Sequence, residues 1–174
     1  MLKDFSAMSD IVIQDERPED AAAIGRITAA AFAGTAYGHN GEAGIVEALR
    51  ADGALTVSLV AVQDGEVVGH VAFSPVSIAG AGGGWYGLGP VSVDPARQRQ
   101  GLGQALIRAG ISRLGELAAA GCVVLGDPGY YGRFGFESDP ALYYADAPAP
   151  YFQRLVLNGP APRGEAFYHP AFGG

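Results

Sequence analysis

The sequence has 174 residues, 49% hydrophobic and 17% charged, with a formal net charge of −7. This composition fits one globular domain with a sizeable core; the acidic balance argues against nucleic acid as a partner, and no apolar run is long enough to predict a membrane span. We therefore expect a single domain over residues 1–174, with residues 1–9 as a mobile leader and no secretory signal. A single cysteine, Cys122, favours the reducing cytoplasm over a disulfide-forming compartment.

The N-terminal part predicts one short strand and two helices. Residues 11–13 favour a strand, and Pro18, followed by two acidic residues, is typical of a helix start. Apolar residues at helical spacing continue this helix to Gly34. A second helix is expected from Glu42 to Ala51, after a flexible connection over residues 34–41.

A β-hairpin is predicted next. Residues 56–62 and 67–73 are rich in β-favouring side chains, and the Asp64-Gly65 pair between them is a strong hairpin signal. Pro75 ends the second strand or confines its tail to a sheet edge. A glycine-rich loop over residues 80–84 then leads into a further strand.

The middle of the chain predicts a strand, a turn and a long helix. Val91 and Val93 indicate a buried strand that Asp94-Pro95 stops, and Gly101 and Gly103 open an amphipathic helix. Unpaired N–H groups at a helix N-terminus bind anions, most often phosphate, and glycine leaves room for the ligand. Two arginines of the loop add attraction for phosphates. The same two glycines also fit a plain turn into a core helix.

The C-terminal part predicts further short strands. Residues 122–125 form a buried strand, expected to run parallel to the central one because a helix connects the two. Residues 127–129 break it, and residues 130–136 predict a short helical turn that ends at glycine. In the proline-rich tail, late strands are expected at 153–157 and 165–169.

Two motifs resemble the GNAT acetyltransferase superfamily. The run Val91-Ser92-Val93-Asp94-Pro95, followed by Gln98-x-x-Gly101-x-Gly103, is similar to the acyl-CoA-binding motif of that family. Residues 123–136 resemble its later strand and its tyrosine-x-x-x-glycine-phenylalanine signature. The order of the predicted elements matches as well, and the resemblance covers residues 11–136.

The resemblance implies an α/β fold with a mixed, mostly antiparallel central sheet of six to seven strands and helices on both faces. The implied order is β-α-α-β-β-β-α-β-α-β(-β). It implies acetyl-CoA as co-substrate, with its acetyl carbonyl where the two central strands splay apart, beside an irregularity at Gly89-Pro90. The residues that it places at the cofactor are Val91, Ser92, Val93, Gln98, Arg99, Gly101, Leu102, Gly103, Gln104, Tyr130 and Arg133.

For catalysis, the resemblance implies that Tyr131 is the general acid that protonates the leaving thiolate. A phenol with a pKa of about 10 can serve in this role. Tyr130 is the alternative if the register of the turn differs by one residue. The structural alternative for Tyr131 is an aromatic packing residue beside its neighbours.

The general base is less clear, because residues 85–93 contain no carboxylate where many family members carry a glutamate. Asp127 follows the adjacent strand and is the favoured catalytic candidate, although an Asp-Pro turn also explains it. The ordinary pKa of a histidine such as His70 suits a general base, but a histidine on a strand also fits a hydrogen-bonded core residue. Glu42 and Glu47 of the second helix are further candidates, or else solvated charges.

The predicted function is transfer of an acetyl group from acetyl-CoA to a primary amine of a small molecule or a protein. The alternative is a CoA-binding module with little or no catalysis. Cys122 could carry an acetyl group but fits a small buried residue better. No metal site is predicted, because His39 and His169 make no ligand spacing with Cys122. The resemblance also suggests a possible homodimer.

Overall fold

The structure is a computed structural model that describes residues 10–33 and 41–173. The leader predicted over residues 1–9 lies outside the described residues, and so does most of the connection predicted over residues 34–41. Among the described helices, none is long and apolar enough to cross a membrane.

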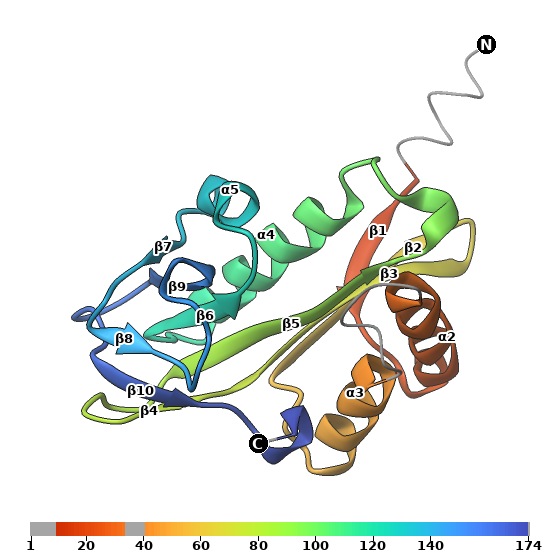
Figure 1. Ribbon diagram of the computed structural model, residues 1–174. Helices are drawn as coiled ribbons and strands as arrows, with labels where there is room; N and C mark the ends of the chain where they lie inside the picture. The colour runs from red at the N-terminus through yellow and green to blue at the C-terminus, as the bar shows by residue number, and fades with distance from the viewer. Residues whose placement is uncertain (1–9, 34–40, 174) are drawn as a thin grey trace.

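One large sheet runs through the molecule (Figure 1), and its strands are β1 (Val12–Asp15), β2 (Val57–Gln63), β3 (Glu66–Pro75), β5 (Trp85–Val93), β6 (Gly121–Leu125), β7 (Glu137–Ser138) and β9 (Phe152–Val156). Their order across the sheet is β1-β2-β3-β5-β6-β9-β7. Neighbouring strands are antiparallel except β5 and β6, which are parallel. The predicted mixed, mostly antiparallel sheet is therefore confirmed.

Helices cover both faces of this sheet (Figure 1); they are α2 (Ala21–Phe32), α3 (Gly41–Ala51), α4 (Leu102–Glu116) and the single turn α5 (Pro128–Tyr131). On one face, Ile24 of α2 and Val46 of α3 bury themselves against Val60 of β2. The next residue back along that strand, Leu59, belongs to the cluster under α4. Because side chains alternate along a strand, α4 lies on the opposite face.

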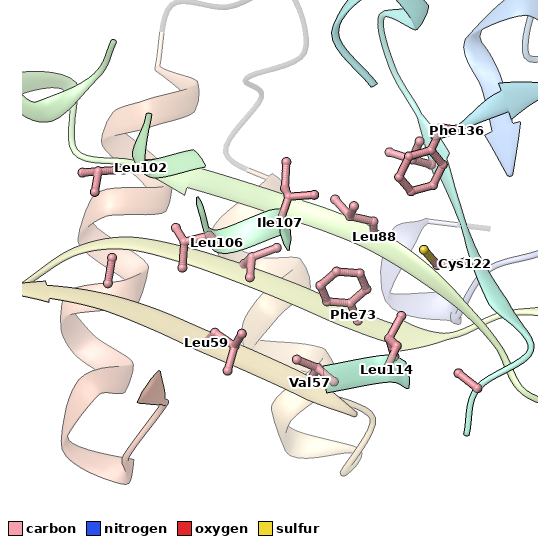
Figure 2. Close-up of a cluster of buried hydrophobic side chains, with 14 of the residues drawn as sticks. Val57, Leu59, Phe73, Leu88, Leu102, Leu106, Ile107, Leu114, Cys122 and Phe136 are labelled. Atoms are coloured by element: carbon pink, nitrogen blue, oxygen red, sulfur yellow. The ribbon is translucent and has the colours of Figure 1, made fainter. Parts of the chain in front are cut away.

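The main core lies between α4 and the sheet (Figure 2). Leu106 and Ile107 of α4 are fully buried and belong to the same cluster as Leu59 and Phe73. Gly110 allows the helix to approach this closely, because a side chain there would collide with the ring of Phe73. The apolar spacing in the sequence thus predicted the buried face of this helix, except that Leu117 follows the helix and is exposed.

The β2–β3 hairpin forms at the predicted pair. Asp64 and Gly65 have φ angles of 54° and 77°, the two positive values that a type I′ turn requires. β2 is shifted by one residue from the predicted range, whereas β3 is longer than predicted at both ends and includes Pro75. The first helix ends at Phe32, and the predicted stop at Gly34 lies outside the described residues.

β5 is irregular in its middle. Its pairing with β3 shifts between Val71↔Val91 and Phe73↔Leu88. Two residues, Gly89 and Pro90, are thereby left opposite one, and Gly89 has a φ of 138° that other residues rarely adopt. The irregularity expected at this pair is therefore present.

A second, three-stranded sheet was not predicted. It consists of β4 (Ser77–Ile78), β8 (Leu142–Tyr143) and β10 (Gly164–Phe167), in the order β4-β10-β8. Its strands are too short to leave a periodic pattern in the sequence. After β10, the imidazole Nε2 of His169 bonds Asp52 Oδ2 at 3.0 Å, beside the end of α3. The described C-terminal segment therefore packs beside α3. The strand expected at 165–169 is present as β10 but ends at Phe167, because His169 caps a short helical turn over Pro170–Phe172.

Candidate active site

β5 and β6 form a fork. They pair at three positions, and the last of these is Gly87↔Val123. Beyond that rung β5 and β6 are no longer paired. The irregularity at Gly89 and Pro90 follows in β5, while β6 keeps its pairing with β9 through Leu125. A groove of about 410 Å³ follows the free stretch of β5, and it is lined by Ala31, Phe32, Val91, Ser92, Val93, Gln98, Arg99, Gly101, Leu102, Gly103, Gln104, Ile107, Tyr130 and Tyr131.

The loop between β5 and α4 provides one end of this groove. Gly101 precedes the helix with a φ of 80°, a left-handed conformation that favours glycine. The first N–H groups of α4 have no partner within the helix, so they can hold an anion. Gln98 fixes the loop to the strand, since its Nε2 donates to the carbonyl oxygen of Val93 at 3.2 Å.

The two arginines of the loop differ in position. Arg97 donates to the side-chain oxygen of Gln63 at the end of β2, so its charge is held away from the groove. Arg99 lines the groove and has a positive φ of 67°. Of the two, Arg99 is therefore the cation placed to attract a phosphate.

The two adjacent tyrosines of α5 lie at different places along the groove. Their rings meet edge to face with centroids 5.0 Å apart. The hydroxyl of Tyr130 lies 3.5 Å from the position of a Cβ atom on Gly103. The ring of Tyr131 packs on Gly126, just after β6. Burial raises the pKa of Tyr130, and burial together with the Tyr130 charge raises the pKa of Tyr131 to about 12.

Arg133 and Asp127 do not line the groove. The Arg133 guanidinium stacks 4.7 Å above the centre of the Tyr130 ring and donates to the carbonyl oxygen of Tyr130 at 2.9 Å. Asp127 is exposed and caps α5, because its Oδ1 accepts from the N–H of Gly129 at 2.9 Å. The cofactor contact of Arg133 and the catalytic role of Asp127 stay predictions.

His70 is fully buried on the α2–α3 face of β3. Ser58 donates to Oε1 of Glu16 at 2.6 Å and lies 2.8 Å from Nε2 of His70. Since the single hydroxyl proton goes to Glu16, Nε2–H is the donor to Ser58. Burial lowers the pKa of His70 to about 4, against the opposing charge of Glu16. His70 is therefore neutral at physiological pH and acts as a core residue rather than a strong base.

The remaining candidate residues differ in their surroundings. Glu47 is exposed and pairs with Arg50 at 2.8 Å, as a solvated helix charge would. Glu42 stands in the first turn of α3, and its buried Oε1 has no hydrogen-bond partner among the described residues. Cys122 is a core residue whose pKa is raised by burial, which does not suit a nucleophile. Across residues 10–33 and 41–173, no cluster of histidine, cysteine and acidic side chains could hold a metal ion.

Three groove residues were not predicted from the sequence. Ala31 and Phe32 come from the end of α2, and Ile107 comes from the second turn of α4. They are apolar residues with an ordinary helical pattern, so only the packing of α2 against β5 shows that they line the groove. No local signal in the sequence could have identified them.

This groove suits a long, thin ligand that carries phosphates at one end and a reactive group at the other, as an acyl-CoA thioester does. The model of the Acetyltransferase (GNAT) family matches residues 23–136. The chain therefore belongs to the GNAT family of acetyltransferases, as the sequence motifs predicted. The predicted enzyme class, an acyl-CoA-dependent N-acetyltransferase, is confirmed by the same match and by the relatives.

Several relatives support this assignment. The chain is 43% identical over 128 residues to the uncharacterized N-acetyltransferase YhbS of Escherichia coli (strain K12), which covers 73% of this chain and 74% of the relative. The crystal structure of a GNAT family acetyltransferase from Brucella melitensis in complex with acetyl-CoA is 53% identical, with a TM-score of 0.83 over 93% of this chain and 97% of that chain. The structure of YhbS from E. coli in complex with CoA is 37% identical, with a TM-score of 0.85 over 94% of this chain and 92% of that one.

Proposed function

We propose that this protein transfers an acetyl group from acetyl-CoA to a primary amine, by direct attack of the amine on the thioester. The observation that carries the proposal is the groove along the free stretch of β5, which connects the N-terminus of α4 to the fork beside Tyr131. The Brucella melitensis relative, similar over 93% of this chain, binds acetyl-CoA. The acceptor is a small molecule or a protein amine, and the net charge of −7 suits a cationic one.

The loop residues would hold the diphosphate. The first N–H groups of α4, at Leu102, Gly103 and Gln104, face an anion with the positive end of the helix dipole behind them. The backbone of Val91 and Val93 would pair with the pantetheine arm, because β5 has no strand partner on that side beyond Gly87. When bound, acetyl-CoA supplies an activated acetyl group.

Acetyl transfer requires the carbonyl oxygen to be stabilised as it gains negative charge. An N–H of the Val91–Val93 backbone can donate to this oxygen, whereas Pro90 has no N–H to offer. The amine nitrogen forms a bond to the carbonyl carbon, the carbon–sulfur bond breaks, and the nitrogen releases one proton. Because no carboxylate among the described residues lines the groove, we propose that water receives this proton; Asp127 remains the candidate side chain.

Tyr131 would act as the general acid at the leaving sulfur. Its pKa of about 12 keeps the phenol protonated at neutral pH. The pKa of a thiol is near 8.5, below that of Tyr131. Complete transfer of the phenol proton to the sulfur before the other bonds change would therefore be energetically uphill. Tyr131 therefore donates a hydrogen bond to the sulfur as charge develops and transfers its proton as the carbon–sulfur bond breaks. The single proton that the nitrogen releases to water then passes to the tyrosinate, so the phenol is restored.

Calorimetry with acetyl-CoA and a thiol-release assay over a panel of primary amines test the proposal. We expect binding together with turnover on at least one amine. Binding without turnover on any amine would favour the alternative, a CoA-binding module without catalysis. Absence of binding would contradict both.

The buried, free Cys122 supports a cytoplasmic location, and the homodimer stays a prediction.

A further inference from the structure

Tyr168 follows β10 in the C-terminal segment, yet its ring lies at the base of the fork. A Cβ atom on Gly87 would stand 2.6 Å from Cε2 of Tyr168. Gly87 pairs with Val123 in the last rung that joins β5 to β6. The ring therefore occupies the space into which any side chain at position 87 would project, beside the point where the two strands separate.

A buried hydroxyl projects to the same face of the sheet as this ring. Gly87 is also the partner of Ser74 on β3, and opposite residues of an antiparallel pair project to the same face. Ser74 therefore shares the face on which Tyr168 lies. Its side chain is completely buried, and its Oγ has no hydrogen-bond partner among the described residues. A buried hydroxyl without a partner destabilises the protein, which points to a ligand that completes its hydrogen bonding.

The surroundings of Tyr168 are aromatic. Its ring centre lies 4.8 Å from that of Tyr144 and 5.1 Å from that of Phe172. No hydrogen bond of its own hydroxyl is found within residues 10–33 and 41–173. Burial raises the pKa of Tyr168, and the charges of Tyr144, Cys122 and Tyr131 raise it further. The phenol is thus neutral and lies within electrostatic reach of Tyr131.

Tyr168 and Tyr131 belong to different faces of the sheet. Tyr131 packs against the core under α4, whereas Tyr168 packs against the cluster that contains Val76, Trp85 and Phe152. The nucleophile must approach the thioester from one side of its plane. α4 and the Tyr131 side chain lie on one side of the sheet, so an acceptor that approaches from the other side meets the face of Tyr168.

We propose that Tyr168 and Ser74 form the acceptor-binding floor of the active site, on the face opposite Tyr131. The two hydroxyls hydrogen-bond the amine group, and the rings of Tyr168 and Tyr144 pack on its aliphatic substituent. This proposal rests on the proposed function, because it assumes that an amine attacks the thioester at the fork. It assigns acceptor selection to the C-terminal segment.

The test uses Tyr168→Phe, which removes the hydroxyl and keeps the ring, in the full chain. The matched control is Tyr143→Phe, because Tyr143 is 50% exposed on β8 and lies outside the groove. The amine is whichever of a panel of polyamines, amino-acid amides and short peptides the wild-type protein acetylates fastest. We expect kcat/KM for this amine to fall about tenfold in Tyr168→Phe, with the Kd for acetyl-CoA within twofold of wild type. Tyr143→Phe should match wild type in both.

A second measurement does not depend on finding an acceptor. Protein labelled with 3-fluorotyrosine gives one fluorine signal for each tyrosine, and the two variants assign those of Tyr168 and Tyr143. Acetyl-CoA should shift the signal of Tyr168 and leave that of Tyr143 in place.

The outcomes separate the two proposals. Unchanged kcat/KM in Tyr168→Phe would overturn the acceptor role, and so would a fall matched by an equal loss of acetyl-CoA affinity. If wild-type protein acetylates no amine, the proposed function fails. The fluorine signals are then the only test of whether Tyr168 lies at the fork. A shift then supports Tyr168 as a residue of the fork, whereas no shift excludes it.

Discussion

The hydroxyl of Tyr130 lies 3.5 Å from the position that a Cβ atom on Gly103 would occupy. Gly103 stands in the first turn of α4, where the unpaired N–H groups are. Tyr130 therefore extends toward the anion-binding end of the groove, while Tyr131 packs on Gly126 beside the fork. Under the proposed function, this placement suits Tyr130 to binding the donor and Tyr131 to the chemical step.

Phenylalanine substitutions should separate these tasks. We expect Tyr130→Phe to raise the Kd for acetyl-CoA about three- to tenfold, because one hydrogen bond is lost, and to leave kcat nearly unchanged. Tyr131→Phe should lower kcat about a hundredfold or more and leave the Kd within twofold. Calorimetry and steady-state rates measure both quantities. Equal kcat values for Tyr131→Phe and wild type would remove Tyr131 as the general acid.

Gly101 should be needed for its backbone conformation. Its φ of 80° costs about 1–2 kcal/mol for an L residue, so Gly101→Ala should destabilise the protein or move the loop and weaken acetyl-CoA binding about tenfold. Gly115→Ala is the matched control in the same helix, because a Cβ there meets no atom within 4 Å. It should raise the free energy of unfolding by about 0.5–1 kcal/mol and leave binding intact. Equal affinities in the two variants would contradict the loop assignment.

Asp127 can be tested by a substitution that keeps its cap. Asparagine caps a helix about as well as aspartate, whereas alanine loses about 1 kcal/mol. Since Asp127 is exposed and bonded to the N–H of Gly129, we expect Asp127→Asn to keep wild-type stability and turnover. Asp127→Ala should lower the free energy of unfolding and leave turnover unchanged. A large loss of kcat in Asp127→Asn, with stability intact, would instead establish the carboxylate as catalytic.

Stability should fall in mild acid because of His70. Burial lowers the pKa of His70 from 6.5 to about 4, so the unfolded chain binds a proton in this interval and the folded chain does not. The difference should cost about 3 kcal/mol as the pH falls from 6.5 to 4. Denaturant unfolding across this range should show the decline, and His70→Gln should flatten it.

The Glu16 carboxylate should affect stability at lower pH than His70 does. Against the effect of burial, hydrogen bonds from Arg50 and Ser58 lower the pKa of Glu16 below 4.5. Its contribution to stability is therefore lost only as the pH falls below that value. A decline between pH 6.5 and 4 that persists unchanged in His70→Gln would show that another group causes it.

The parts of the fold that were predictable depend on local signals. Asp64-Gly65 determines a hairpin by its own backbone preferences, and the glycines at 101 and 103 mark a helix start whatever surrounds them. The alternating valines of β5 and the aromatic segment after β6 lie where the motifs placed them. Such features need only a few adjacent residues, so they can be interpreted without knowing the tertiary structure.

The features that were missed depend on contacts between distant segments. The sequence around Tyr168 gives no sign that its ring covers Gly87, and Phe32 gives none that it faces the groove. Likewise, the bond between Arg97 and Gln63 reverses the expected role of that arginine. The position of His70 on a strand favoured a core residue over a base, and its complete burial agrees with that interpretation.

The separation of β5 from β6 leaves a strand edge uncovered in the interior of the sheet, from Leu88 to Val93. Uncovered edges are templates for pairing with other chains, which is how many proteins begin to aggregate. A ligand seated along this edge would protect it. Hydrogen exchange of these amides should therefore slow when acetyl-CoA is added, and the ligand-free protein should be the more prone to self-association at high concentration. The groove that we propose for the donor is, when the donor is absent, the weak point of the sheet.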